Sequence, residues 1–133
     1  TFQMRLEVGA RVPYGMTALG RAYHCGLPEA ARTAMLEEHR KMGRKEDWEG
    51  FRASFDKAVR EYQKNGFCVS LGEWNKDVYS VAVPLVSRDH SKVLALTCAG
   101  PPFEMTRSRI FEELGPRLIQ LRDRLFAATG GSF

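Results

Sequence analysis

Hydrophobic and polar side chains alternate along residues 78–100, VYSVAVPLVSRDHSKVLALTCAG, in the pattern of a β-hairpin. Two runs rich in β-branched and apolar residues flank a polar loop, which we interpret as Ser87–His90. Because successive side chains of a strand point to opposite sides, the hairpin has one bulky face and one face of small residues. The bulky face, with Tyr79 and Leu85, predicts a core. The small face predicts either a closely packed helix or room for a ligand.

The length of the hairpin loop sets the register of the two strands. A loop of Ser87–His90 pairs Val86 with Ser91 and places Ser80 opposite Thr97. Directly paired residues of antiparallel strands point to the same side of the sheet. A further strand is expected over residues 67–72, FCVSLG, with the same division between large and small side chains. Together the three strands predict a sheet with one bulky face and one small-residue face.

The remaining pattern predicts one more strand and four helices. The strand covers residues 1–8, and the helices are expected over residues 16–25, 29–42, 46–64 and from the N-cap Thr106 onward. Gly115–Pro116 should kink or split the last helix, and the chain should fray from Ala127. The predicted order is therefore strand, three helices, three consecutive strands and a helix. Sequential strands with short connections predict an α+β fold, an antiparallel meander whose faces are covered by helices.

Composition places the chain among ordinary globular domains. The 133 residues, 44% hydrophobic and 27% charged, correspond to a single domain. No apolar run approaches the roughly 18 residues that a membrane span needs, and no signal-peptide pattern opens the chain. The net charge is +4, but lysines and arginines are spread among acidic residues. We interpret this distribution as a solvated surface rather than a nucleic-acid footprint.

The residues that could carry out chemistry are few and scattered. Three cysteines without a CxxC pair argue for a reducing, cytoplasmic setting and against a disulfide framework or a zinc ribbon. The three histidines have no metal-ligand spacing, and the chain has no GxSxG motif or P-loop. We expect no metal, no cofactor and no enzymatic activity.

The small face of the sheet is the strongest candidate for a binding site. Hydroxyls and small side chains would line it, from Cys68, Ser70, Ser80, Ala82, Thr97 and Ala99. Larger side chains before and after the strands could form its walls and rim, namely Tyr14, Met16, Leu19, Tyr23 and Trp74. Such a surface makes a concave apolar pocket with a few groups that orient a ligand. Alternation alone leaves this reading and a tightly packed helix equally open.

Several segments, in the same order and over nearly the whole chain, resemble one protein family. GARVPYGMTALGRA resembles the G-x-x-x-P…T/S-A-x-G-K/R-A signature of the effector domain of IclR-type bacterial transcriptional regulators. The resemblance continues through EYQKNGF, VSLGE, VYSVAVPLVSRD, LALTCAGPP and RIFEELGPRL. It implies a GAF-like fold, an antiparallel sheet flanked by helices, that binds a small-molecule effector. It also implies homodimers or homotetramers.

The resemblance implies a set of site residues on this chain. The family's pocket uses a glycine loop with the following helix and positions on three strands. Together with Met16 from the wall described above, the predicted effector site comprises Gly9, Tyr14, Met16, Ala18, Leu19, Ser70, Val78, Ser80, Thr97 and Ala99. The sheet members Ser70, Val78, Ser80, Thr97 and Ala99 also belong to the small face deduced from alternation. The implied ligand is a small organic acid, and the aromatic residues nearby favour an aromatic one.

The chain also departs from the family pattern. Gly15 stands where the family often has His, Asp77 and His90 stand where it usually has Gly, and Ala99 stands where a hydroxyl is common. Relatives begin with further strands and with a winged helix-turn-helix domain that binds DNA. We therefore interpret residues 1–133 as a single effector-binding domain that begins inside the family domain, so that DNA is bound only through an N-terminal domain absent from this chain.

Two other classes of function remain open. The first is a small enzyme on a GAF-like scaffold, with Cys68 or Cys25 as the nucleophile. The second is a purely structural oligomerisation module, in which a helix covers the small face and leaves no cavity.

Overall fold

An antiparallel sheet of three strands, β1 (Cys68–Leu71), β2 (Tyr79–Val86) and β3 (Val93–Gly100), forms the centre of the fold. The structure is a computed structural model that describes residues 8–11, 13–43 and 45–133. Its helical segments are α1 (Ala18–Gly26), α2 (Glu29–Met42), α3 (Lys45–Asn65), α4 (Arg107–Arg109), the π-helical η1 (Ile110–Leu114) and α5 (Gly115–Thr129). The predicted α+β meander is confirmed. The strand expected over residues 1–8 lies outside the described residues, apart from Val8.

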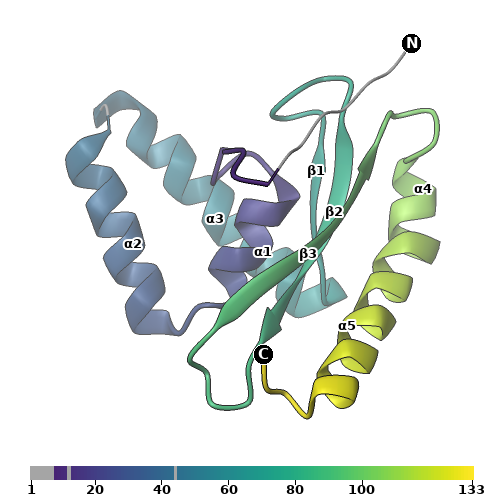
Figure 1. Cartoon of the computed structure of the whole chain (residues 1–133). Helices are drawn as coiled ribbons and strands as arrows, with labels where there is room; N and C mark the ends of the chain where they lie inside the picture. Colours follow the sequence, from purple (N-terminus) through teal and green to yellow (C-terminus); the bar gives the residue numbers. More distant parts are fainter. Residues whose placement is uncertain (1–7, 12, 44) are drawn as a thin grey trace.

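The helices lie on both sides of the sheet. In Figure 1, α1 lies against one side with α3 and α2 beyond it, and α5 covers the opposite side. The boundaries of α2 agree with the predicted ones, and α3 extends the prediction by one residue at each end. Gly66 ends α3 with a φ of +82°, and its N–H donates to the carbonyl of Tyr62 at 2.7 Å. This is the helix end that Asn65–Gly66 predicts.

The bulky face of the sheet forms an apolar core beneath the last helical segments. Side chains from all three strands, among them Val69 and Val83, pack there against Ile110 and Leu118. Ile110 and Val83 are fully buried. The predicted role of this face as core is confirmed.

The small face of the sheet is covered by α1 at close range. Ala18 and Ala22 of the helix are fully buried against Cys68 and Ala82 of the strands. A Cβ atom added to Gly26 would lie only 2.8 Å from side-chain atoms of β2 and β3. Small residues on both surfaces therefore allow the helix to approach the sheet, which is one of the two readings that the alternation left open.

The hairpin loop is longer than the sequence pattern indicated, which corrects the register. Val86 pairs with Val93, and Ser80 pairs with Ala99 rather than with Thr97. The loop is extended because the Asp89 carboxylate accepts hydrogen bonds from the side chain of Ser87 and from the backbone and side chain of Ser91. The error in the pairing is two residues, and the side-chain period of a strand is also two. The assignment of residues to the two faces is therefore unchanged.

The last helix is not split at Gly115–Pro116: α4, η1 and α5 follow one another without a gap, and Ile110, Leu114 and Gly115 have αR backbone angles. Thr106 caps its start and accepts a hydrogen bond from the N–H of Arg109 at 3.2 Å. The π-helical segment η1 lies directly before Gly115–Pro116. A proline lacks an N–H group and its ring would clash with the preceding turn of a regular helix, so the helical hydrogen bonding changes at this point.

The fraying expected from Ala127 is not observed. The helix continues to Thr129 and ends at Gly130, which has a φ of +63°. The backbone N–H of Arg88 in the hairpin loop then donates to the carbonyl of Gly131 at 2.8 Å. The tail is therefore held by contacts with residues that are distant in the sequence. The local sequence pattern carries no information about such contacts.

Candidate functional site

The ten predicted site residues fall into two groups in the structure. One group precedes or begins α1 and comprises Gly9, Tyr14, Met16, Ala18 and Leu19. The other group lies on or next to the strands and comprises Ser70, Val78, Ser80, Thr97 and Ala99. Gly9 is exposed, and a side chain there would meet no atom within 4 Å. Its φ of +93° is the reason that the position favours glycine.

A single hydrogen bond joins the two groups. The hydroxyl of Ser70 donates to the carbonyl of Met16, just before α1, at 2.6 Å. Ser70 pairs with Ser80 across β1 and β2, and Ser80 pairs with Ala99 across β2 and β3. The start of α1 therefore lies at the end of the small face that carries these hydroxyls.

Thr97 and Ala99 lie toward the less covered edge of the small face. Thr97 is exposed on β3, and its hydroxyl donates to the carbonyl of Val81 at 3.2 Å. Ala99 is half-buried, whereas Ser80 is buried. Helix α1 therefore covers the β1 and β2 side of the small face more completely than the β3 side.

The segment before α1 has its carbonyl groups tied to side chains. Thr17 caps the helix by accepting the N–H of Gly20 at 3.1 Å, and its hydroxyl donates to the carbonyl of Pro13 at 2.7 Å. The carbonyl of Gly15 accepts from the hydroxyl of Ser54 on α3 at 2.9 Å. With the bond from Ser70, these contacts hold the segment in one conformation. The first N–H groups of a helix have no partner within the helix, so they remain directed out of its start.

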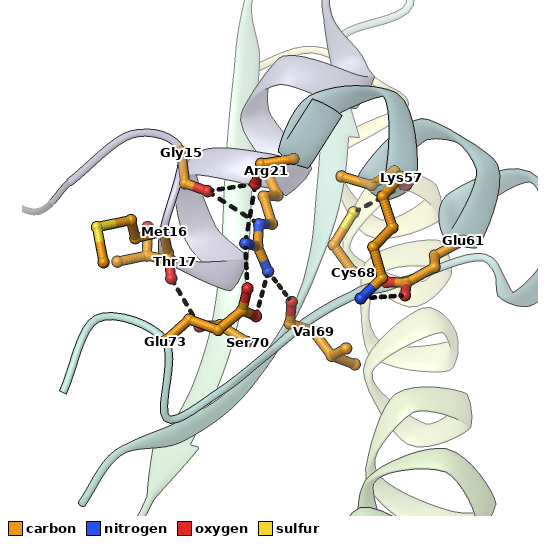
Figure 2. A network of polar contacts seen from close by, with 12 residues as sticks. Gly15, Met16, Thr17, Arg21, Lys57, Glu61, Cys68, Val69, Ser70 and Glu73 are labelled. Carbon is orange, nitrogen blue, oxygen red and sulfur yellow. Dashed lines mark hydrogen bonds and ion pairs between the residues drawn. The ribbon is translucent and has the colours of Figure 1, made fainter. Parts of the chain in front are cut away.

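Arg21 is the centre of this network, and the sequence analysis did not single it out. Its guanidinium donates to the carbonyls of Gly15 and Val69, to the hydroxyl of Ser54 and to both carboxylate oxygens of Glu73, at 2.7 to 3.1 Å (Figure 2). These bonds use all five donors of the guanidinium. Arg21 occupies the K/R position of the family signature, which was the signal available in the sequence. The partners of its guanidinium could not be predicted because several of them lie far away in the sequence.

The charge of Arg21 is neutralised within the protein. The Arg21 side chain is buried, and the Glu73 side chain is about half exposed. Hydrogen bonds from Arg21 lower the pKa of the Glu73 carboxyl, so it is ionised at neutral pH. Arg21 therefore positions the segment before α1 and has no donor left for a ligand.

A cluster of aromatic rings packs around Tyr14. Its hydroxyl and Nδ1 of His24 share a hydrogen bond of 3.1 Å, and its ring stacks on that of His39. His24 is buried against Phe55. Burial, with the positive charge of Arg32, lowers the pKa of His24 to about 4, while burial raises the pKa of Tyr14. At neutral pH His24 is therefore uncharged, and the Tyr14 hydroxyl keeps its proton.

Two hollows open on either side of Tyr14, which contributes to both together with His39. One hollow, of about 530 Å³, is lined mainly by the segment before α1 and by α3, and its charged residues include Arg21 and Glu73. The other, of about 470 Å³, is lined by Tyr14, Leu19, Gly20, Tyr23, Met35, His39 and Ala95. The second hollow has no carboxylate among these lining residues. Of the predicted site residues, Tyr14 and Met16 reach the first hollow, and Tyr14 and Leu19 reach the second.

The two cysteines considered above as nucleophiles, Cys25 and Cys68, lie against each other, away from solvent. Cys68 is fully buried, and its pKa is raised by its hydrogen bond with Cys25 and by burial. Cys25 is also buried.

Within the described part of the chain, no group of three or more His, Cys, Asp or Glu side chains is arranged to hold a metal ion. Among the described helices, none has the length and apolar character to cross a membrane.

Comparison with known proteins gives a consistent family. The family model described as bacterial transcriptional regulator IclR C-terminal matches residues 1–124. The HTH-type transcriptional regulator TsaQ1/TsaQ2 of Comamonas testosteroni is 29% identical over 119 residues, which cover 89% of this chain and 42% of that protein.

Solved structures show the same fold. An IclR family transcriptional regulator from Brucella abortus superposes with a TM-score of 0.87 at 38% identity, over 95% of this chain and 47% of that one. The inducer-binding domain of a double mutant of PobR from Acinetobacter, in complex with 3-hydroxy benzoic acid, superposes with a TM-score of 0.66 at 17% identity, over 86% of this chain and 65% of that one. The chain spans about half the length of the full-length proteins that it matches.

Proposed function

This chain belongs to the IclR family of bacterial transcriptional regulators, as their C-terminal domain, and on that premise we propose that it senses a small organic acid. The acid binds where the start of α1 meets the small-residue face of the sheet. Its binding favours one arrangement of subunits in a cytoplasmic homodimer or homotetramer. That arrangement changes the spacing of DNA-binding domains carried elsewhere in the full-length protein, because a ligand shifts an equilibrium by its difference in affinity for the two states.

One observation carries the choice of site. Leu19 belongs both to the first turn of α1 and to the wall of the second hollow, whose lining among the described residues includes no carboxylate. Free N–H groups and the positive end of the helix dipole favour an anion at a helix start. The aromatic rings of Tyr14 and Tyr23 line the same hollow, where they can make apolar contacts with the ring of an aromatic ligand. An acid with an aromatic ring can use both features together.

The other hollow is less suited to an acid. Glu73 contributes a negative charge there, and the donors of Arg21 are already occupied. A carboxylate placed there would lose water without gaining a charged donor. The difference between the two hollows supports the acid-binding proposal for the one next to Leu19.

The comparison with PobR supports an aromatic acid as the first class to test. The inducer-binding domain of the PobR double mutant was crystallised with 3-hydroxy benzoic acid, and it shares the fold of this chain. The volume of about 470 Å³ lies within the range that binds small ligands. Ala95 is the β3 residue that lines this hollow, and Ser80 and Thr97 lie beyond it on the same face of the sheet. Their hydroxyls are proposed to contact a ligand that reaches past Ala95.

The proposal is tested by thermal denaturation with benzoate, 3-hydroxybenzoate, phenylacetate and an aliphatic dicarboxylate. A ligand at about 100 times its Kd stabilises the fold by roughly 2.7 kcal/mol, which raises the melting temperature by several degrees. Leu19→Glu should abolish the shift caused by acids because its carboxylate repels them. Leu19→Gln is the matched control, of equal size but uncharged, and should retain most of the shift.

A double variant tests the sheet side of the site. Ser80→Leu combined with Thr97→Leu should weaken binding by removing both hydroxyls, and a urea denaturation curve checks that the added volume at the buried Ser80 has not unfolded the domain. If the hits bind equally well to this variant and to Leu19→Glu, the acid binds elsewhere on the domain and the proposed site is wrong.

A further inference from the structure

Two cysteines from different elements meet beneath α1. Cys25 lies near the end of α1 and Cys68 begins β1, and their Sγ atoms are 3.7 Å apart. Both side chains are held by their surroundings: Cys68 packs with Ala22 of α1 and Ala58 of α3 in the same apolar cluster. A disulfide bond requires the sulfur atoms to approach to about 2.05 Å. The two thiols are therefore already neighbours, and a small movement of α1 toward β1 would bring them to bonding distance.

The two thiols differ in a way that assigns them different roles. Cys25 is 8% exposed, whereas Cys68 is fully buried. The hydrogen bond from Cys68 and the positive charge of Arg32 lower the pKa of Cys25, although burial opposes this. Hydrogen bonding to Cys25 and burial raise the pKa of Cys68. A small oxidant would therefore meet Cys25 first, because it is the more accessible of the two thiols and the one whose pKa is lowered, with Cys68 held as a thiol beside it.

We propose that Cys25 and Cys68 are an oxidation site at which a hydroperoxide forms a reversible disulfide between α1 and β1. The Cys25 thiol loses its proton, its thiolate sulfur attacks one peroxide oxygen, and the O–O bond breaks. The departing hydroxide takes up that proton, so a sulfenic acid and one water are formed. The sulfur of Cys68 then attacks the sulfenic sulfur, and the departing hydroxide takes the Cys68 proton and leaves as water. Two thiols and one hydrogen peroxide thus give one disulfide and two waters, and a dithiol reductant reverses the change.

The bond would act on the element that begins at the site considered above. Cys25 is on the helix whose start carries Ala18 and Leu19, and Cys68 is two residues before Ser70, which bonds the carbonyl of Met16. The disulfide would fix α1 on β1 at a second point. The oxidation itself is independent of the proposed function, so it can be tested without any effector. In reducing compartments, disulfides of this kind are characteristically transient and redox-sensing.

The test treats the folded chain with hydrogen peroxide, blocks free thiols, and analyses the tryptic digest without reduction. The expected product is a cross-link between peptides 22–32 and 65–76, lighter by two hydrogen atoms than the sum of the two peptides. Cys98→Ser is the matched control and should give the same cross-link, because Cys98 lies on the opposite face of the sheet. A dithiol reductant should remove the cross-link.

Two further variants separate the roles of the thiols. In Cys68→Ser, dimedone should capture a sulfenic acid on Cys25, since the thiol that would resolve it is missing. In Cys25→Ser, Cys68 should remain unlabelled in the folded protein. Circular dichroism checks that both variants fold. Labelling of Cys68 in preference to Cys25 would overturn the assignment of roles.

The melting temperature provides a second readout. The cross-link closes a long loop, so the oxidised protein should melt on the order of 10 °C higher than the reduced protein. Oxidation that produces only an intermolecular bond through Cys98, or no bond in the folded chain, overturns the proposal. A cross-linked protein with an unchanged melting temperature would overturn the inference that the bond fixes α1 on the sheet.

Discussion

The two faces of the sheet are built on opposite principles. Beneath α5, large apolar side chains such as Val83 and Ile110 fill the space between helix and strands. Beneath α1, alanines and a cysteine allow the helix to come close, with Ala22 against Ala82. Large side chains that fill the space stabilise the packing on one face, and small side chains that allow close approach of α1 stabilise it on the other. The first should suffer most from loss of atoms and the second from their addition.

The faces also differ in their buried polar groups. The core cluster beneath α5 consists of apolar residues, whereas Thr17, Arg21 and His24 of the α1 segment are buried with Ser70 and Ser80 of the strands. Thr17, Arg21 and Ser70 are hydrogen-bonded through their side chains, and the pKa of His24 is lowered because it lies away from water. Sensitivity to pH and to the loss of a charge should therefore be concentrated on the α1 side, where the candidate site lies.

The largest effect is expected on the bulky face. Ile110→Ala removes a fully buried side chain from the core and should lower the free energy of unfolding by about 2 to 5 kcal/mol. Leu121→Ala on α5 is the control, since that side chain is about half exposed, and it should cost well under half as much. Urea denaturation measures both. Equal losses would show that the space beneath α5 is not the tightly filled core described here.

The next effect is a dependence on pH on the α1 side. His24 has a folded pKa of about 4 and an ordinary value of 6.5, because burial and the nearby charge of Arg32 disfavour its protonated form, while Asp56 partly opposes them. The unfolded chain takes up the proton first as the pH falls. Stability should be full above about pH 6.5 and should decline toward pH 4, by roughly 3 kcal/mol in total.

A variant isolates the contribution of His24 from those of other groups. His24→Phe should flatten the stability curve between pH 6.5 and pH 4, whatever its effect at neutral pH. His90→Asn, in the exposed hairpin loop, should keep the original curve. A curve that is the same in all three proteins would place the pH dependence outside the α1 side.

A smaller effect is expected from added volume on the small face. Ala22→Leu forces extra atoms between α1 and the strands and should destabilise the fold by about 1 to 3 kcal/mol. Ala34→Leu, the same substitution on an exposed position of α2, should change stability by no more than about 0.5 kcal/mol. If Ala22→Leu is tolerated equally well, the close approach of α1 does not constrain this face.

The smallest effect is expected at the Arg21–Glu73 pair. Glu73→Gln leaves the buried guanidinium without its charged partner, and should cost about 1 to 2 kcal/mol because Glu73 itself is half exposed. Glu37→Gln, at the exposed pair with Arg40, should leave the melting temperature unchanged. Thermal denaturation at low and at moderate salt measures both. A loss in Glu73→Gln that disappears at moderate salt would mark the pair as an ordinary surface contact.

Much of this fold could be predicted from local pattern. The period-two alternation assigned residues of β1, β2 and β3 to their correct faces, even though the hairpin register was wrong by two residues. The register was wrong because the Asp89 carboxylate accepts hydrogen bonds from Ser87 and Ser91, on both sides of the loop, and the loop is therefore longer than predicted. The number of residues in such a loop cannot be predicted from its polar composition alone. The site residues on the sheet stay a prediction, since ligand contacts were read only from pattern and resemblance.

The sequence by itself determined which side chains share a face, the bounds of α2, and to which family the chain is similar, because these depend on neighbouring residues and on motif order. Only the tertiary structure decided that α1 covers the small face, that the five donors of Arg21 are occupied, and that Cys25 meets Cys68. Arg21 and Val69, like Cys25 and Cys68, are more than forty positions apart in the chain. Such pairs are set by how helices pack on the sheet, and no local period records that packing.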